Sequence, residues 1–500
     1  MRAEIDIVHN PFGTLPESSS EKWRGLCASY LPVKAEASIW RYSRAPAPAD
    51  PEQGWKLHVS ATILTANVVF ERAAPFLSGR GVLFKAPATL QELERINSGL
   101  YHGYSQIGKF ITVYPQSDAE ARLLAGRLHR LTRGLSAPAI PFDLRFRPDS
   151  NVYYRYGAFV PLRIEHPDGT STLAMRDPQG NLVPDLRESV EAKPAWVGDP
   201  LIAGWPRPEA RAPESPLRTS FRAFRSLTQR GKGGVYQAVD LTTQTPRLCV
   251  LKEGRRDGEP AWDGRDGHWR VRQEERVLKL LRAGRIDAPR VYASFEAGGN
   301  YYLVTEFIEG ESLQNILQGL KRRMSVSRVL RYGVQLATLV SQIHSAGWVW
   351  RDCKPSNVMV TKKGTLRPLD FEGACPVDEP DPVPWSTPEF APPESRATGG
   401  GRARVCDDLY ALGAVIYFLL TGRPPAASSS PLAKLRRNIP TGVSRLVEAL
   451  LSADPRRRPC AQMVAERLKA LGPPPRSATR PVLAGRGSSV GRKRGVEEGV

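Results

Sequence analysis

The alternation of apolar and polar positions differs between the two halves of the chain. Before residue 200, short runs with β-like alternation, such as Lys56 to Ile63 and Phe110 to Tyr114, are interspersed with helical patterns. The clearest helical pattern is Asp118 to Arg133, where apolar residues recur at roughly helical spacing. The first half is therefore predicted to be a mixed α/β domain.

In the second half, strands and helices separate along the sequence. Strand-like segments dominate up to Phe307, and long helical patterns dominate from Arg328 onward. This order predicts a small β-rich lobe followed by a larger helical lobe. The whole chain is thus expected to be a multidomain α+β protein.

Two shifts in composition mark the domain boundaries. The run from Pro200 to Pro216 is rich in proline, which disfavours regular elements, and the residues after Gly472 include few large apolar side chains. We expect an N-terminal domain over residues 1–200, a linker over 201–217, a second domain over 218–471 and a disordered basic tail over 472–500.

Composition excludes several classes of protein. With 500 residues, 41% hydrophobic and 24% charged, the chain is not globally disordered. The six cysteines are scattered without a CxxC pair, which argues against a disulfide framework or a structural zinc site. The longest apolar stretch, Leu409 to Leu420, is shorter than the roughly 20 residues that span a bilayer. We expect a cytoplasmic protein with no membrane partner.

The net charge of +20 is unevenly distributed. Residues 1–200 carry 23 Lys/Arg against 21 Asp/Glu, or +2, so residues 201–500 carry +18. Such a basic region attracts nucleic acid, membranes or acidic peptides alike. No nucleic-acid-binding motif accompanies it. We therefore predict no nucleic-acid partner, and we hypothesise that the basic surface attracts an acidic leader peptide.

Two short segments in the second half carry the residues of a phosphotransferase. Residues 350–357 read WRDCKPSN and residues 370–373 read DFEG. Phosphoryl transfer needs a carboxylate beside the attacking hydroxyl, a lysine near the moving group and side chains that hold magnesium. Asp352, Lys354, Asn357 and Asp370 can fill these roles in that order.

On these motifs, residues of about 218 to 471 resemble the bilobal protein kinase fold. The resemblance implies that Lys252 steadies the nucleotide phosphates with Glu274 as its ion-pair partner, and that Thr305, Glu306 and Phe307 form the hinge that meets the purine. It further implies ATP or another NTP and Mg²⁺ as cofactors, and a Ser/Thr-directed kinase. The glycine-rich loop would contribute Gly231, Gly233, Gly234 and Val235 to nucleotide binding.

The sequence also departs from the kinase pattern. Thr228 and Arg230 stand where glycines are usual, Trp350 replaces a histidine and Glu372 replaces a glycine. None of these changes removes the proton acceptor or a metal ligand. The alternative is a pseudokinase that binds nucleotide or acts only as a scaffold.

The first half contains a second set of cationic residues. Lys56 and His58 lie two apart in a predicted strand and so share a face. A neutral lysine can remove the acidic α proton of a phosphoserine or phosphothreonine, while histidine assists the departing phosphate and cations bind its oxygens. The pair alone is a weak signal. Further cationic residues in the same domain strengthen it: Lys85, Lys109, Arg145, Arg147 and Arg155.

The lines GWKLHVSAT, VLFK, YSQIGKFITVYP and VYYRYGAF, followed by a kinase-like half, resemble class III and class IV lanthipeptide synthetases. In that family this half is a phosphoSer/Thr lyase domain. The resemblance implies that Lys85 is the general base, with a pKa lowered by neighbouring cations, and that His58 is the general acid. It implies phosphate binding by Lys56, Lys109, Arg145 and Arg155, with Arg147 a further candidate.

Together the halves predict a peptide dehydratase that phosphorylates Ser/Thr of a precursor peptide and eliminates the phosphate. The expected partner is a peptide with a Ser/Thr-rich core. The relatives continue into a cyclase domain. If this chain ends at Val500, thioether rings would be made by a separate cyclase, form without an enzyme or not be made at all; a longer natural chain is the fourth alternative. Two alternatives remain: a Ser/Thr kinase with a non-catalytic docking or sensor domain, and a pseudokinase scaffold.

Overall fold

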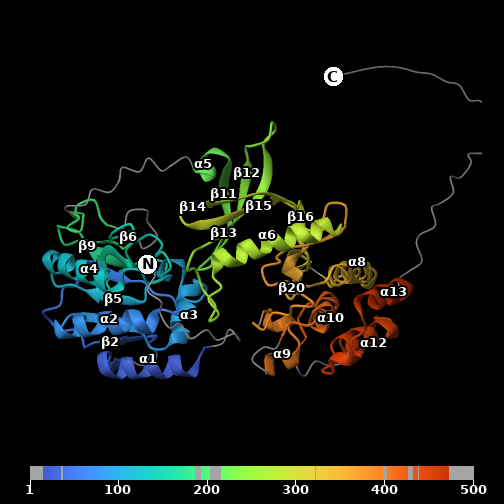
Figure 1. Ribbon diagram of the computed structural model, residues 1–500, viewed down its shortest axis with the longest axis horizontal. Coiled ribbons are helices and arrows are strands. Elements are labelled where there is room, and N and C mark those ends of the chain that lie inside the picture. Colours follow the sequence, from blue (N-terminus) through green and yellow to red (C-terminus); the bar gives the residue numbers. More distant parts are fainter. Residues whose placement is uncertain are drawn as a thin grey trace, which may run out of the picture.

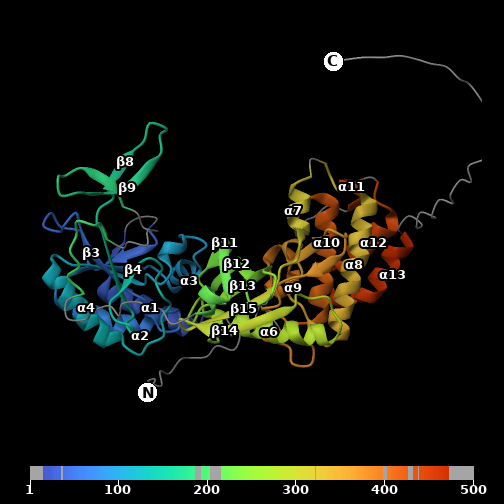
Figure 2. The ribbon, with the colours of Figure 1, turned by 90° about the horizontal axis from the view of Figure 1, so that it is seen from above.

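The computed structural model describes most of the chain. The described ranges are 15–34, 38–185, 193–202, 215–320, 322–383, 385–397, 402–425, 432–436 and 438–471. The predicted tail, 472–500, and most of the predicted linker lie outside these ranges. Figure 1 shows an N-terminal domain, a β-rich small lobe and a helical lobe, and Figure 2 shows the small lobe between the other two.

The N-terminal domain is built on a seven-stranded antiparallel sheet with strand order β1-β2-β4-β5-β3-β7-β6. A smaller sheet, ordered β10-β9-β8, projects from it (Figure 2). The strands are β1 (Val33–Lys34), β2 (Trp40–Tyr42), β3 (Gln53–Val59), β4 (Leu83–Pro87), β5 (Ile111–Tyr114), β6 (Leu144–Arg145), β7 (Val152–Ala158), β8 (Arg163–Glu165), β9 (Ser171–Arg176) and β10 (Leu182–Pro184).

The helices of this domain cover one face of the large sheet. Trp55, Leu57 and Val59 alternate along β3 into a core that these helices complete, whereas Lys56 and His58 point to the opposite face. The core therefore leaves the other face of the sheet for polar side chains. The helices are α1 (Glu17–Tyr30), α2 (Ala66–Gly79), α3 (Leu90–Ser98) and α4 (Asp118–Thr132).

The predicted helix from Asp118 to Arg133 is confirmed as α4, which Ser117 caps at its N-terminus by accepting from the Glu120 amide. The strand predicted from Lys56 to Ile63 is wrong at both ends, because β3 runs from Gln53 to Val59. Beyond Val59, Thr62 and Thr65 exchange backbone and side-chain hydrogen bonds that replace a strand ladder.

The second half has the predicted order of a β-rich lobe and a helical lobe. A five-stranded antiparallel sheet, ordered β11-β12-β13-β15-β14, packs against α6 (Gly267–Ala283). Its strands are β11 (Phe221–Arg230), β12 (Gly233–Asp240), β13 (Arg247–Gly254), β14 (Val291–Ala297) and β15 (Asn300–Glu306), preceded by the short helix α5 (Pro216–Thr219).

The helical lobe is centred on α8 (Val326–Ser345) and α10 (Val405–Thr421), whose buried apolar faces share one core with α12 (Thr441–Leu450) and α13 (Ala461–Leu471). Short elements carry the loops between them: β16 (Gly310–Ser312), α7 (Leu313–Gln318), β17 (Trp348–Val349), β18 (Val358–Thr361), β19 (Leu366–Pro368), β20 (Cys375–Pro376), α9 (Pro393–Ala397) and α11 (Leu432–Leu435). Within the described ranges, no helix is long and apolar enough to cross a membrane.

The N-terminal domain and the small lobe are in direct contact. Trp262, from the loop between β13 and α6, is 4% exposed and belongs to the core of the N-terminal domain. The amide of Gly231 donates to the Ser98 carbonyl at 3.0 Å, and Arg255 donates to the Tyr104 hydroxyl. The N-terminal domain thus contacts both the turn between β11 and β12 and the loop between β13 and α6.

Candidate active sites

The first site lies between the small lobe and the helical lobe. Lys252 on β13 donates to both carboxylate oxygens of Glu274 on α6 at 2.6 Å, and its ammonium lies 4.0 Å from Asp370. Burial opposes the charge of Lys252, but the carboxylates of Glu274 and Asp370 outweigh it and raise the pKa of this lysine. A charged lysine is thus fixed beside Asp370, as the kinase resemblance predicts.

Asp352 is surrounded by hydrogen-bond donors. Lys354 Nζ lies 2.8 Å from Asp352 Oδ2, and the amide of Asn357 donates to the same oxygen at 2.9 Å. The hydroxyl of Thr387 donates to Asp352 Oδ1 at 2.9 Å and accepts from Lys354 at 2.9 Å. Burial and the nearby Asp370 raise the pKa of Asp352. Thr387 was not among the predicted site residues, since it lies 35 positions from Asp352.

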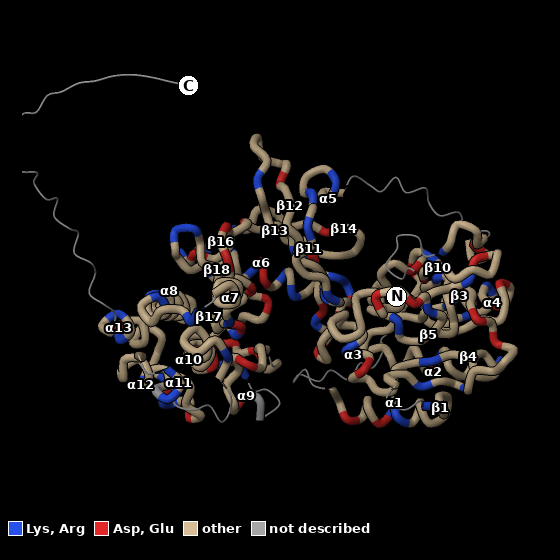
Figure 3. Tube along the Cα trace, turned by 180° about the vertical axis from the view of Figure 1, so that it is seen from behind, with Lys and Arg blue, Asp and Glu red and all other residues tan. Residues whose placement is uncertain are grey.

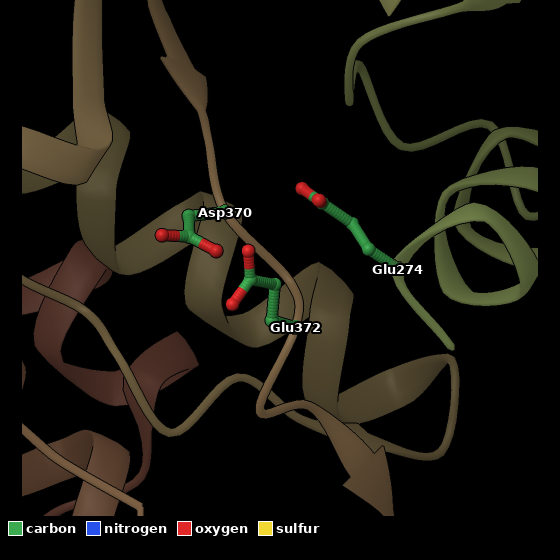
Figure 4. A group of neighbouring side chains, drawn as sticks. All are labelled: Glu274, Asp370 and Glu372. Carbon is green, nitrogen blue, oxygen red and sulfur yellow. The ribbon is translucent and has the colours of Figure 1, made fainter. Parts of the chain in front are cut away.

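The oxygen ligands that magnesium prefers are present near Lys252. Glu274, Asp370 and Glu372 offer carboxylate oxygens that lie within 4.8 Å of one another (Figure 4). Asn357 uses its amide nitrogen toward Asp352, so its oxygen is the atom suited to a cation. Asp370 and Asn357 thus offer oxygens of the kind that could bind a magnesium ion.

Trp350 takes over a supporting role at the position where a histidine was expected. Its indole nitrogen donates to the Asp370 carbonyl at 3.1 Å, and its ring stacks on Phe371 with centroids 5.6 Å apart. Asp408 accepts from the backbone amides of Trp350 and Arg351 at 2.8 and 2.7 Å. The substitution thus leaves the backbone that carries Asp352 and Asp370 braced.

The glycines of the loop between β11 and β12 permit close backbone packing. A Cβ on Gly233, whose φ is 148°, would lie 1.7 Å from the Glu253 carbonyl oxygen, and one on Gly231 would lie 1.7 Å from that of Asn97. A Cβ on Gly234 would meet the Tyr236 hydroxyl at 2.4 Å, and Val235 pairs with Lys252 in the sheet. These glycines therefore have a packing role, whatever they contribute to nucleotide binding.

The predicted hinge spans the end of β15, with Thr305 and Glu306 in the strand and Phe307 after it. The Glu306 carboxylate accepts from Arg367 at 2.6 and 2.9 Å, so its side chain is committed to an ion pair. Phe307 comes directly after the strand and is half-buried. A purine at this position would be met by backbone groups, as the resemblance implies.

A carboxylate also organises the segment that follows Asp370. Asp381 accepts from Arg265 at 2.6 and 3.1 Å and from Arg351 at 3.0 Å. Arg351 is the residue before Asp352 and has a φ of 70°. This pairing connects the catalytic loop, the start of α6 and the segment that contains Glu372.

The second site lies on the polar face of the N-terminal sheet. Strand register places Lys85 opposite Thr112, Thr112 opposite His58, and His58 opposite Tyr153, which in turn pairs with Arg145. These five residues, from five neighbouring strands, form one row across the face. Lys56 pairs with Arg155 two residues further along.

His58 is buried and held by a carboxylate that sequence analysis missed. Its Nδ1 lies 2.5 Å from Asp143 Oδ2, and Lys109 Nζ lies 3.2 Å from Asp143 Oδ1. Burial lowers the pKa of His58 to about 3, with Lys109 and Lys56 adding to the effect and Asp143 opposing it. His58 is therefore neutral at pH 7. The nearest signal for Asp143 was its place two residues before Arg145.

Asp143 is the negative centre of this site. Its side chain is fully buried, and burial alone would favour the neutral acid. Interactions with His58 and Lys109, including a hydrogen bond from His58, outweigh burial and lower the pKa of Asp143 to about 2. The site thus holds an ionised carboxylate between a histidine and a lysine.

Lys85 lies two strands from His58, about 10 Å away between α-carbons. Its ammonium is 4.4 Å from the centre of the Trp40 ring and 5.8 Å from that of Tyr42. Lys56 is 8% exposed and lies on the same face. Lys56, His58 and Lys85 are thus brought together as predicted.

The predicted arginines occupy different environments. Arg155 is 4% exposed and forms an ion pair with Asp185, whereas Arg145 is exposed, donates to the Ser150 carbonyl at 2.7 Å and lies 5.5 Å from the Tyr153 ring. Arg147 packs on Phe146 at 4.3 Å. The Phe146 ring in turn lies 6.0 Å from that of His129 on α4.

Comparison with known proteins agrees with this architecture. Residues 32–213 match the family described as RamC, N-terminal domain, and residues 224–468 match the protein kinase domain. The chain is 34% identical over 399 residues to the probable SapB synthase of Streptomyces coelicolor, which covers 77% of this chain and 41% of that relative. It thus spans less than half the length of SapB synthase.

Other relatives match the second half. Serine/threonine-protein kinase pkn2 of Myxococcus xanthus is 32% identical over 277 residues, covering 50% of this chain and 32% of pkn2. Serine/threonine-protein kinase PknA of Mycobacterium tuberculosis is 27% identical over 289 residues, covering 53% and 65% respectively. The chain therefore joins a RamC-type N-terminal domain to a protein kinase domain.

Proposed function

We propose that this protein is a peptide dehydratase of lanthipeptide-type biosynthesis. It would phosphorylate Ser and Thr of a precursor peptide and then eliminate the phosphate to give dehydroalanine or dehydrobutyrine. The single observation that carries the proposal is the polar face of the N-terminal sheet, where Lys85 and His58 share one cross-strand row beside a kinase domain.

In the phosphorylation step, Asp352 accepts the proton of the attacking hydroxyl and Lys354 stabilises the moving phosphoryl group. Lys252, fixed by Glu274, binds the phosphates of ATP or another NTP. Asp370 and Asn357 would hold Mg²⁺, which supplies charge neutralisation of the phosphates. Glu306 and Phe307 at the hinge, and the loop of Gly231, Gly233, Gly234 and Val235, would complete the nucleotide site.

In the elimination step, the neutral amine of Lys85 takes the α proton of the phosphorylated residue. The C–H electron pair becomes the Cα=Cβ bond, and the Cβ–O bond breaks with its electrons leaving on the phosphate. Lys56 and Lys109 stabilise the phosphate charge, with Arg145 and Arg155 as further cations on this face. The elimination uses side chains of the N-terminal domain alone.

The role of His58 as an acid depends on where it obtains a proton. In the ligand-free site His58 is neutral and engages Asp143 through Nδ1, so exchange with the phosphate would use Nε2. A phosphate that binds as its monoanion brings one proton, which His58 can hold and return to the leaving oxygen. Bound phosphate would also favour the charged imidazole. His58 is thus proposed as the general acid.

Tethering both sites in one chain raises the effective concentration of the phosphopeptide at the second site. The name of SapB synthase assigns that relative to the synthesis of SapB, and the shared architecture supports a precursor peptide with a Ser/Thr-rich core as substrate here. We propose that the reaction takes place in the cytoplasm.

The test is incubation with a cognate precursor peptide, ATP and Mg²⁺, followed by mass spectrometry. Each modified residue should lose about 18 Da, the mass of water. Asp352→Asn should abolish all modification. A phosphopeptide that persists with the unmutated protein would instead support a kinase with a non-catalytic N-terminal domain, and an unmodified peptide would support a scaffold.

A further inference from the structure

One departure from the kinase sequence pattern, Glu372, is paired with a lysine of the glycine-rich loop. Lys232, at the tip of the turn between β11 and β12, forms an ion pair with Glu372, the residue that replaces the usual glycine. The Lys232 side chain is 23% exposed and that of Glu372 is 7% exposed. Neither residue was assigned a role in the phosphotransfer described above.

The ion pair lies at the phosphate end of the kinase site. Glu372 shares its oxygen cluster with Asp370 and Glu274 (Figure 4), and Glu274 binds Lys252. Lys232 therefore lies next to the group in which the nucleotide phosphates and their magnesium would be bound. Two lysines, one from the turn before β12 and one from β13, converge on this cluster of carboxylates.

The backbone around Lys232 is fixed on both sides. Its carbonyl accepts from the Arg255 amide at 2.8 Å, and its own amide donates to Glu259 at 3.3 Å. The preceding residue, Gly231, donates to the Ser98 carbonyl of the N-terminal domain at 3.0 Å. The tip is thus held in one position before any nucleotide binds, and the N-terminal domain contributes to holding it.

The same loop is poor in the glycines that let backbone amides approach phosphates. Thr228 and Arg230 occupy two of the three usual glycine positions, and both pair regularly with β12. A loop with side chains at these positions has less room for close backbone contact. An ammonium on a four-carbon stem can reach the phosphates where the backbone does not.

We propose that Lys232 is a phosphate-binding residue of the nucleotide site, and that Glu372 positions its ammonium until phosphate oxygens replace the carboxylate. The charged side chain of Lys232 thus compensates for the glycines missing at positions 228 and 230, and Glu372 holds that side chain in place. This inference rests on the proposed kinase reaction, but its test measures binding and needs no turnover.

The experiment compares the affinities of the full chain for ATP and for adenosine by calorimetry. Lys232→Met should weaken ATP binding about tenfold or more, the effect of one lost hydrogen bond between charged groups, and leave adenosine binding unchanged. Lys232→Arg should restore most of the ATP affinity because it keeps the charge. The matched control is Lys362→Met, which removes an exposed lysine paired with Glu309 and should change neither affinity.

Lys232→Met leaves the buried Glu372 carboxylate unpaired, which lowers stability. We therefore pair the double variant Lys232→Met/Glu372→Gln with Glu372→Gln alone as its reference. The double variant should bind ATP about tenfold more weakly than this reference. Thermal unfolding without nucleotide reports whether each variant is folded.

Unchanged ATP affinity in both comparisons would overturn the role of Lys232. An equal loss of ATP and adenosine affinity would also overturn it, since a general distortion of the lobe would then explain the result. If the unmutated protein binds no ATP, the proposed kinase reaction fails first, and this inference falls with it. A loss specific to ATP supports the inference.

Discussion

At the scale of single residues, the N-terminal site is defined by titratable side chains that are buried together. Asp143 is hydrogen-bonded to His58 and forms an ion pair with Lys109. The sequence predicted that Lys56 and His58 share a face, because alternation along a strand is local. It did not predict Asp143, since a partner 85 residues away is brought in only by tertiary packing.

This burial predicts how the stability of the protein depends on pH. The pKa of His58 is about 3 in the folded state and about 6.5 when unfolded, so between these values the unfolded chain binds more protons. Stability should therefore fall as pH falls below 6.5. Between pH 8 and pH 5, the lowered pKa of His58 should reduce the free energy of unfolding by about 2 kcal/mol.

Urea unfolding at a series of pH values would measure this dependence. Between pH 8 and pH 5, the unfolding free energy of the unmutated protein should fall by about 2 kcal/mol more than that of His58→Gln, a variant that keeps a hydrogen-bond donor toward Asp143. Asp143, with its pKa of about 2, stays ionised and contributes little there. An identical pH slope in the variant and the unmutated protein would contradict a buried neutral His58.

At the scale of elements, strand order and register decide which residues meet. Periodicity predicted α4 and located β3 without its correct ends, because both signals lie within about fifteen residues of sequence. The order β4-β5-β3-β7 was not predictable, since pairing between distant strands depends on the helices packed beneath them. That order alone places Lys85 and His58 on either side of Thr112.

In the kinase domain, the segment after Asp370 is held by an acidic residue. Many kinases order this segment with pairs between arginine and a phosphorylated residue. Here Asp381 already accepts from Arg265 and Arg351, the arginine adjacent to Asp352. The Asp381 carboxylate therefore supplies the negative charge without modification.

Asp381→Asn should lower the rate of peptide phosphorylation about tenfold or more, because it leaves the largely buried Arg351 without its counter-charge. Asp381→Glu should retain most of the rate. Elimination from a peptide supplied already phosphorylated should be unaffected, because that site is in the other domain. Phosphorylation by Asp381→Asn at the unmutated rate would refute this role.

At the scale of the molecule, the two domains share part of their structure. Lys/Arg and Asp/Glu are interspersed along the described chain (Figure 3). Residues 472–500, outside the described ranges, carry six Lys/Arg against two Asp/Glu, or +4 of the net charge.

Within the described ranges, the domains are joined by specific contacts at Trp262, Gly231 and Arg255.

Trp262 gives a direct test of this connection. Trp262→Ala should destabilise the N-terminal domain by about 3–5 kcal/mol, although the residue lies within the kinase sequence, because it empties a place in that domain's core. Chemical denaturation followed by hydrogen exchange of β3 and β5 would show the change. Trp196→Ala, at a position 46% exposed, serves as the control and should change little. Unaltered exchange in β3 would argue against the shared core.

The central claim is that one chain performs two reactions at separate sites, and complementation between two inactive variants tests it most directly. Lys85→Met with precursor peptide, ATP and Mg²⁺ should accumulate a product about 80 Da heavier per site, the phosphopeptide. Adding Asp352→Asn protein, which keeps the elimination site, should convert it to a product about 18 Da lighter than the starting peptide. A phosphopeptide that stays unchanged after this addition would contradict an elimination site separate from the kinase site.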